Sequence, residues 1–252
     1  MLDKTKINKA VELIKKSDYT VAFTGAGISV ESGIPPFRGP GGLWSQYDPI
    51  ILDLDYYRIH TEKSWPIIKK LFFDFFGSAK ANVAHLSLAK MEQEGRLQAI
   101  ITQNIDNLHQ EAGSKVVHEF HGNSRQFICM ECASVYQRKD LELTNEPPHC
   151  HHKNCNGLLK PDFIFFGEGI PVDAYEASIQ AAKKADVFIL IGTTGEIMPA
   201  SQIPFLAKQN GAKIIELNIE QSNFTSQITD VFIQGKASET MQEIMNNLSI
   251  AT

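Results

Sequence analysis

Long apolar runs and basic clusters are both missing from this 252-residue chain. The apolar run VFILI is far too short to cross a bilayer, and no group of adjacent lysines or arginines exceeds two residues. The formal net charge of -5 would repel a phosphate backbone. The amino-terminal segment MLDKTKINKAVELIKK interrupts its apolar residues with charges, unlike a signal peptide. We therefore expect a cytoplasmic globular protein without a direct nucleic-acid or membrane partner, and a monomer is the simplest assembly.

Cysteine is scarce, and four residues do not suggest a disulfide framework in a chain of this size. They form two close pairs separated by residues 133–149: Cys129 with Cys132, and Cys150 with Cys155. Two thiolate pairs held apart by one loop suit a tetrahedral zinc site with no position left for water. We predict one structural zinc ion that stabilises a subdomain. Three histidines beside the second pair are alternative ligands of lower rank: His149, His151 and His152.

Short β-branched runs alternate with helical stretches along most of the chain. Strands are predicted at 19–23, 98–102, 186–192 and 212–218, and helices at 4–16, 172–184 and 201–209. This alternation favours the α/β class, with a parallel sheet covered on both faces. Two segments break the rhythm. Residues 127–159 are polar and cysteine-bearing and read as an insertion, and an irregular segment at about 35–80 follows the first strand.

A glycine-rich turn follows the first predicted strand. Gly25 and Gly27 would let the backbone approach a pyrophosphate, with a helix expected directly afterwards. Val30 stands where the usual dinucleotide fingerprint has a third glycine, so an ordinary tight turn remains an equal alternative. Arg38 in the Gly/Pro loop suits phosphate oxygens, although a solvated loop arginine fits equally well.

A second polar cluster, TQNIDNLH, follows the strand at 98–102. Gln103, Asn104 and Asp106 would lie at the carboxyl end of the sheet, where ligands bind in such folds. The alternative is an Asn/Asp turn that caps a helix from residue 107 onward. The sequence also offers several histidines as a general base, and spacing alone does not choose among them: His85, His118 and His121.

Ten motifs occur in order between residues 21 and 220: GAGIS, SGIP, FRGPGGLW, TQNID, FHGN, two cysteine pairs, PDFIFFGE, GTT, PAS and LNIE. Together they resemble the sirtuins, the NAD-dependent protein lysine deacylases. The resemblance implies a doubly wound, Rossmann-like NAD-binding domain at 1–126 and 160–252. It also implies a zinc-ribbon insertion at 127–159, with an acyl-lysine peptide bound between the two.

The resemblance assigns roles to individual residues. His121 would be the catalytic general base, acting with Asn104 and Asp106. NAD would be held by Gly25, Ala26, Gly27, Ile28, Ser29, Phe37, Arg38, Gln103, Asn104, Ile105, Asp106, Gly192, Thr193, Thr194, Asn218, Glu220 and Ala237. The peptide would lie as an added strand against Phe166, Gly167, Glu168, Gly195 and Glu196.

The implied reaction consumes NAD and yields nicotinamide, O-acyl-ADP-ribose and free lysine. Tyr56, Tyr57 and Arg58 lack the Tyr-x-x-Arg spacing of the branch that removes acidic acyl groups, so we expect acetyl or a longer neutral acyl group. An apolar acyl pocket or ordinary core packing would each explain four phenylalanines: Phe72, Phe73, Phe75 and Phe76. A protein ADP-ribosyltransferase or an NAD glycohydrolase is the alternative activity, and a zinc-ribbon interaction module is the non-enzymatic one.

Overall fold

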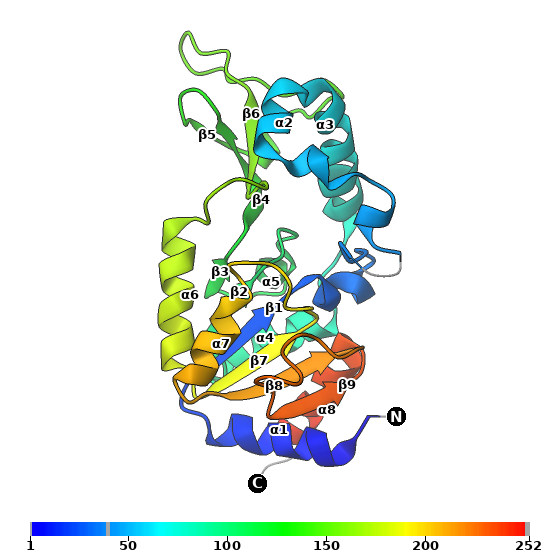
Figure 1. Ribbon diagram of the computed structural model, residues 1–252, viewed down its shortest axis with the longest axis vertical. Helices are drawn as coiled ribbons and strands as arrows, with labels where there is room; N and C mark the ends of the chain where they lie inside the picture. Colours follow the sequence, from blue (N-terminus) through cyan, green and yellow to red (C-terminus); the bar gives the residue numbers. More distant parts are fainter. Residues whose placement is uncertain (1, 39–40, 250–252) are drawn as a thin grey trace.

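Six parallel strands form the main sheet in the order β3-β2-β1-β7-β8-β9, with both halves wound outward from β1 (Figure 1). The computed structural model describes residues 2–38 and 41–249, without the side chain of Phe75. The strands are β1 (Thr20–Thr24), β2 (Ala99–Thr102), β3 (Val117–Glu119), β7 (Val187–Ile191), β8 (Lys213–Asn218) and β9 (Val231–Gln234). The sheet confirms the predicted doubly wound α/β class.

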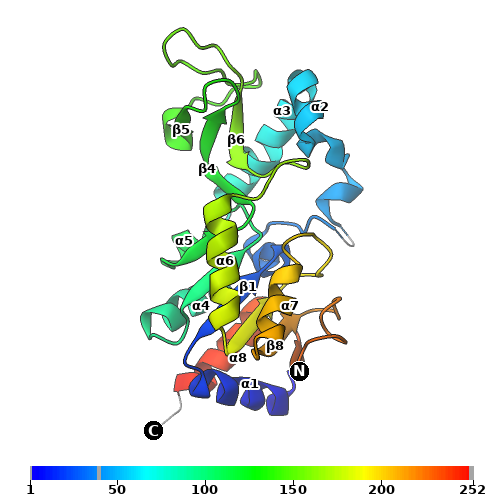
Figure 2. The same cartoon turned by 60° about the vertical axis from the view of Figure 1, so that its left-hand side comes forward.

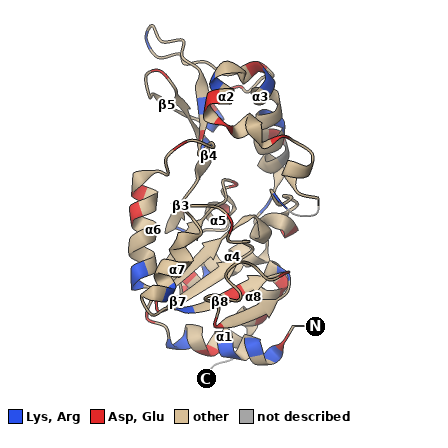
Figure 3. Cartoon of the chain, in the orientation of Figure 1, with Lys and Arg blue, Asp and Glu red and all other residues tan. Residues whose placement is uncertain are grey.

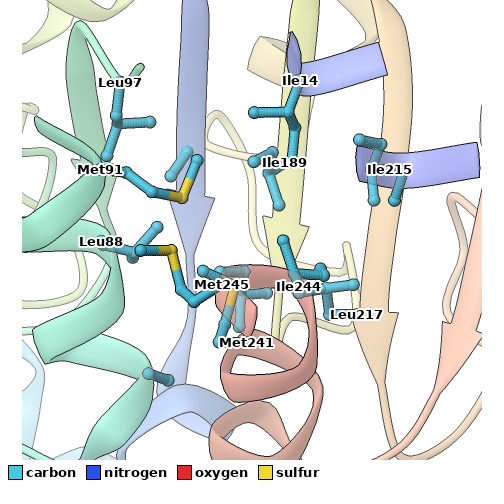
Figure 4. Packing of buried hydrophobic residues seen from close by; sticks show 14 of the residues in the cluster. Ile14, Leu88, Met91, Leu97, Ile189, Ile215, Leu217, Met241, Ile244 and Met245 are labelled. Carbon is cyan, nitrogen blue, oxygen red and sulfur yellow. The ribbon is translucent and has the colours of Figure 1, made fainter. Parts of the chain in front are cut away.

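Helices cover both faces of this sheet, and alternate strand residues face opposite layers. The helices are α1 (Lys4–Lys16), α4 (Val83–Gln93), α5 (Leu108–Glu111), α6 (Val172–Lys184), α7 (Gln202–Gln209) and α8 (Ala237–Ser249). On one face, Ile189 and Ile215 pack against α1, α4 and α8, as Figure 4 shows for Ile14, Met91, Met241 and Met245. On the other face, Phe23 and Phe188 pack with residues of α6 and α7.

A second lobe stands above the carboxyl ends of the main strands (Figures 1 and 2). It contains the antiparallel strands β4 (Gly122–Cys129), β5 (Val135–Gln137) and β6 (Leu159–Phe163). Beside them lie α2 (Leu54–Ile59), α3 (Thr61–Ile68), a π-helical turn (Lys69–Phe75) and 3-10 turns at Leu43–Ser45, Pro49–Leu52, Phe76–Ser78 and Arg138–Asp140. The two stretches share one core, in which the Trp65 ring lies 6.0 Å from that of Phe127. The segment predicted at 35–80 is therefore largely helical and completes the second lobe.

Three of the four phenylalanines considered for an acyl pocket pack against aromatic rings of the second lobe: Phe72, Phe73 and Phe76. The Phe72 ring lies 5.1 Å from Phe163, and the Phe73 ring lies 5.2 Å from Phe127. Phe72 and Phe76 are almost fully buried. These three side chains form the core of the second lobe, and the side chain of Phe75 lies outside the described residues.

The helix predicted after the glycine turn is present, but it is a 3-10 helix and not an α-helix. The segment is a seven-residue 3-10 helix, Ala26–Ser32, that Gly33 ends with a φ of 90°. Tertiary contacts explain the difference, because the backbone is held by a hydrogen bond from Gly27 N to Gly192 O and by one from Asn82 Nδ2 to Ile28 O. A short 3-10 helix offers an anion its backbone N–H groups rather than a long helix dipole.

Charges of both signs occur on α1, and α6 carries its acidic residues near its beginning and its basic residues at its end (Figure 3). No helix in the described ranges is long and apolar enough to cross a membrane.

Candidate active site

Three loops meet at the carboxyl ends of the central strands. Thr24 of β1 lies level with Thr102 of β2 and with Ile191 of β7, so the chain leaves the three strands at one height. The residues that follow are Gly25, Gln103 and Gly192. This is the crevice where open α/β sheets bind their ligands.

Glycine is required in this crevice because two loops touch. A Cβ on Gly27 would lie 2.5 Å from the Gly192 Cα, and a Cβ on Gly25 would lie 2.7 Å from the Gly192 oxygen. Gly192 itself has a φ of 61°. Val30 stands where the dinucleotide fingerprint has its third glycine. Its side chain is 44% exposed, so the close loop contact that requires Gly25 and Gly27 does not extend to this position. Loop packing thus accounts for the two glycines that the sequence offers, and it leaves bare backbone facing the crevice.

Ser29 is the centre of a buried polar network below this backbone. Its Oγ donates to Asp106 Oδ2 at 2.7 Å and accepts from Asn104 Nδ2 at 3.1 Å. Asn104 Nδ2 also lies 3.2 Å from the Gly25 oxygen. Burial raises the pKa of Asp106, while hydrogen bonds from Ser29 and from the Leu108 backbone oppose the rise. Asp106 also accepts the N–H of Leu108, the first residue of α5, so the same carboxylate makes a helix-capping contact.

His85, one of the three histidines that the sequence offers as a general base, is a member of this network. Its Nε2 lies 3.5 Å from Ser29 Oγ, and its Nδ1 accepts the N–H of Asn82 at 3.3 Å. Burial lowers the pKa of His85 to about 4, so the ring is neutral. The capping box of Asn82 and His85 at the start of α4 is the signal that fixes its position.

His121 follows β3 and faces the same crevice through Gln103. The His121 Nδ1 lies 3.1 Å from the Gln103 carbonyl oxygen, and this contact requires a proton on Nδ1. In the neutral ring Nε2 is then a free acceptor. Burial lowers the pKa of His121, although its hydrogen bond to Gln103 acts in the opposite direction. A neutral imidazole with an unprotonated Nε2 is the form a general base requires.

The β7–α7 turn, residues 192–201, is tied to its neighbours on both sides. Gln103 Nε2 donates to Thr193 Oγ1 at 3.0 Å, and Asn218 Nδ2 donates to the Thr193 oxygen at 3.1 Å. Thr194 is exposed, and its carbonyl accepts the N–H of Asn223 at 3.0 Å. Most of the predicted NAD residues are therefore linked by direct hydrogen bonds.

Other predicted NAD residues lie at the margins. Ile28 and Ile105 point into the two cores, so only their backbones are available to a ligand. Glu220 is exposed beyond β8, and Ala237 is the first residue of α8. Ala26 is half-buried at the start of the 3-10 helix.

The predicted cofactor loop contacts both the second lobe and the β7–α7 turn. The Phe37 ring lies 5.4 Å from Trp44 and 6.3 Å from Phe72. Arg38 Nη1 lies 3.5 Å from Glu196 Oε2, and both side chains are about half exposed. The predicted phosphate ligand and the predicted peptide contact thus pair with each other. An exposed pair of this kind adds little stability, so it opens at small cost.

The predicted peptide-binding segment around Phe166 already forms backbone hydrogen bonds with residues 52–54 along one edge. Phe166 donates its N–H to the Leu52 oxygen at 2.7 Å and accepts the N–H of Leu54 at 3.0 Å. Its side chain is 45% exposed, and Gly167 follows with a φ of 91°. One edge of this short strand is therefore occupied by residues 52–54.

Glu168, a predicted peptide contact, pairs with a buried lysine. Its Oε2 lies 2.9 Å from Lys160 Nζ and accepts the N–H of Phe165 at 2.6 Å. Lys160 is 4% exposed and also donates to the carbonyls of Pro161 and Phe163, each at 2.8 Å. Burial lowers the pKa of Lys160, and the charge of Glu168 counters that effect. A lone lysine inside the apolar run GLLKPDFIFF is the sequence signal for this site.

The cysteine cluster fits a zinc ion. The four sulfur atoms lie within 4.8 Å of one another, with 3.7 Å between Cys129 and Cys155 and 3.6 Å between Cys132 and Cys150. A tetrahedron with Zn–S bonds of about 2.3 Å has edges of about 3.8 Å. Three backbone N–H groups donate to the sulfur atoms at 3.4 Å: those of Glu131, His152 and Gly157. Within the described residues, no histidine joins this cluster.

The doubly wound sheet and the polar crevice at its carboxyl edge are those of a dinucleotide-binding protein, and the four-cysteine cluster beside them is compatible with a zinc ion. The Sir2 family model matches residues 25–199. An NAD-dependent protein deacylase 2 of Pyrobaculum aerophilum is 39% identical over 94% of each chain. An NAD-dependent protein deacetylase of Thermodesulfovibrio yellowstonii is 41% identical over 96% of this chain and 94% of its own. This protein belongs to the Sir2 family.

A solved structure described as Sir2-p53 peptide-NAD+ has a TM-score of 0.88 and 35% identity to this chain. The match covers 97% of this chain and 99% of the solved one. Both lobes are therefore included in the likeness.

Proposed function

We propose that this protein removes acyl groups from lysine side chains of proteins and consumes NAD as a co-substrate. The products are nicotinamide, O-acyl-ADP-ribose and free lysine. The observation that carries the proposal is the contact of His121 Nδ1 with the Gln103 carbonyl oxygen at 3.1 Å, which puts the proton on Nδ1 and leaves Nε2 as the basic nitrogen. The relatives named as NAD-dependent deacylases and the NAD-bound structural neighbour support it.

The residues of the crevice would have different roles in binding and catalysis. The pyrophosphate would lie against the side-chain-free backbone of Gly25, Gly27 and Gly192, and Asn104 and Asp106 would orient the nicotinamide ribose. His121 Nε2 would take a proton from a ribose hydroxyl, which is the general-base step. When bound, NAD supplies the ribose to which the acyl group is transferred.

We infer a preference for acetyl or longer neutral acyl groups. Tyr57 is fully buried and donates its hydroxyl to the Leu159 oxygen at 3.2 Å. Arg58 is largely exposed and lies 3.6 Å from Asp55. Neither side chain is placed to bind an acyl carboxylate as a pair, which supports a neutral substrate.

Mass spectrometry of products tests the proposal. The protein is incubated with NAD and acetyl-, butyryl-, myristoyl- and succinyl-lysine peptides, with His121→Ala as the control. We expect deacylated peptide and O-acyl-ADP-ribose to appear together with the neutral peptides and to disappear in the variant. NAD consumption without deacylation would replace the proposal with the glycohydrolase or ADP-ribosyltransferase alternative.

Lys160→Met should weaken peptide binding specifically. The change removes the cation that pairs with Glu168. This ion pair anchors the segment around Phe166, so the segment loses its anchor. Breaking a buried pair costs about 3–5 kcal/mol, so local distortion is expected. We expect the KM for acetyl-lysine peptide to rise about tenfold, whereas the KM for NAD stays near its original value.

Steady-state titration of each substrate in turn measures this split. Lys69→Met is a matched control, because Lys69 Nζ lies 2.7 Å from Asp74 Oδ2 in the same lobe but away from the peptide segment. Equal increases in both KM values for the Lys160 variant would count against a peptide-specific role.

A further inference from the structure

A buried carboxylate in β8 has no role in the network described so far. Glu216 is 1% exposed, and its two oxygens accept hydrogen bonds from three hydroxyl groups. Ser222 Oγ lies 2.5 Å from Oε1, Thr229 Oγ1 lies 2.7 Å from Oε2, and Thr225 Oγ1 lies 2.9 Å from both. Burying a carboxylate is costly unless donors replace its water, so all three hydroxyls are held firmly.

These three hydroxyls belong to the β8–β9 loop, residues 219–230. The loop is closed further by its own contacts, in which Ser222 Oγ accepts the N–H of Phe224 at 3.1 Å and Thr225 Oγ1 accepts the N–H of Ser222 at 2.8 Å. The hydroxyls of Ser222 and Thr225 therefore each accept a backbone N–H and donate to Glu216. The carboxylate thus fixes the loop backbone as well as its side chains.

The β8–β9 loop in turn supports the β7–α7 turn. The N–H of Asn223 donates to the Thr194 oxygen at 3.0 Å, and Asn223 Nδ2 lies 3.4 Å from the Gly195 oxygen. Phe224 is fully buried under Gly195, where a Cβ on the glycine would lie 2.7 Å from the ring. A continuous chain of contacts therefore runs from Glu216 through Ser222 and Phe224 to the turn.

We propose that Glu216 is a positioning residue for deacylation, which holds the β8–β9 loop so that the turn at 192–196 presents NAD and the acyl-lysine peptide to each other. The inference rests on the proposed function, because that turn bears predicted contacts to both substrates. Misplacement by about 1 Å far from the chemistry can lower a rate about 100-fold. Glu216 touches neither substrate, so its effect passes entirely through the loop.

Steady-state kinetics with NAD as the varied substrate tests this inference. Glu216→Leu keeps the bulk but leaves three hydroxyls without an acceptor, and we expect kcat/KM for NAD to fall about 100-fold. Glu216→Gln keeps one carbonyl oxygen, and the hydroxyls can rotate to accept from its amide, so most of the activity should return. Direct binding of ADP-ribose, measured by calorimetry, should weaken in the leucine variant and recover in the glutamine variant.

A matched control separates positioning from general stability. Asp186 also binds a hydroxyl, that of Ser17, and the N–H groups of Asp18 and Tyr19, but at the amino end of β7. Asp186→Leu should lower the unfolding temperature and leave kcat/KM for NAD unchanged. An equal kinetic loss in both leucine variants, or none in a folded Glu216→Leu, would overturn the inference.

Milder variants apply if Glu216→Leu does not fold. Ser222→Ala removes the hydroxyl that links Glu216 to the Phe224 N–H, whereas Thr229→Val removes a hydroxyl that donates to Glu216 without bonding Phe224 or the turn. We expect the first to lower kcat/KM for NAD more than the second, and the reverse order would contradict the inference. A wild-type protein without NAD-dependent deacylation would instead refute the proposed function.

Discussion

Replacing His121 with asparagine should lower kcat/KM for deacylation by about 10²- to 10⁴-fold, the usual contribution of a general base. The asparagine Nδ2 takes the place of the imidazole Nδ1 and keeps the hydrogen bond to the Gln103 oxygen. The variant therefore removes the basic nitrogen and preserves the tie to the loop at 103–108. Calorimetry should show NAD bound with nearly its original affinity, because the loss belongs to the chemical step.

The pH profile of the wild-type protein checks the same assignment. Burial places the pKa of His121 below the ordinary histidine value of 6.5. A base acts only when unprotonated, so kcat/KM should be level at neutral pH and fall as the pH drops through that lowered pKa. This descending limb should vanish in His121→Asn.

His118→Ala is the matched control for His121. His118 lies in β3 three residues earlier, and burial also lowers its pKa, but its register partner is Ile101 inside the sheet. Its replacement should leave the deacylation rate close to that of the wild type. A loss as large as that of His121→Asn would mean that the histidine assignment is wrong.

Local periodicity predicts the main helices well because each buries one face. The helix predicted at 4–16 has the observed bounds of α1, and its four apolar positions are buried. The helix predicted at 172–184 likewise matches α6. The central strands are found within one residue of their predicted ends, because β1 and β7 each bury five consecutive, mostly apolar residues between two helix layers.

Tertiary contacts determine the rest, and a local pattern does not reveal them. The segment after Gly27 forms a 3-10 helix because of Gly192, which lies 165 positions away in the sequence. Residues 35–80 look irregular because their apolar partners are strands beyond residue 122. Spacing leaves the general base open among three histidines, and only the contact with Gln103 gives His121 the required tautomer. In the sequence, Glu216 and Lys160 look like ordinary charged residues, and only the folded structure shows the partners that surround them.

Cys132→Ala should abolish zinc binding and unfold the second lobe while the main sheet persists. Removing one thiolate opens a closed four-cysteine site, and structural zinc contributes about 10–16 kcal/mol in zinc-finger peptides. Cys132 is exposed, so the substitution leaves no cavity of its own. Metal analysis should give one zinc per wild-type chain and almost none for the variant.

Tryptophan fluorescence reports this lobe alone. Both tryptophans of the chain, Trp44 and Trp65, lie in the helical stretch that shares its core with β4 and β6. Trp65 is fully buried and donates Nε1–H to the Thr144 oxygen at 3.0 Å, so opening the lobe should move its emission to longer wavelength. A strong chelator should produce the same shift in the wild-type protein.

His152→Ala separates ligands from neighbours at this site. His152 supplies only its backbone N–H to the Cys150 sulfur, and alanine keeps that donor. This variant should retain zinc and an unshifted emission spectrum. Loss of zinc in His152→Ala would mean that a histidine replaces a thiolate as a zinc ligand. Unchanged tryptophan fluorescence in a zinc-free Cys132→Ala would mean that the shared core keeps the second lobe folded without metal. The second lobe supplies the segment around Phe166 that is predicted to bind the peptide. If loss of zinc unfolds this lobe, as we expect for Cys132→Ala, then zinc is required for peptide binding and takes no part in the chemistry.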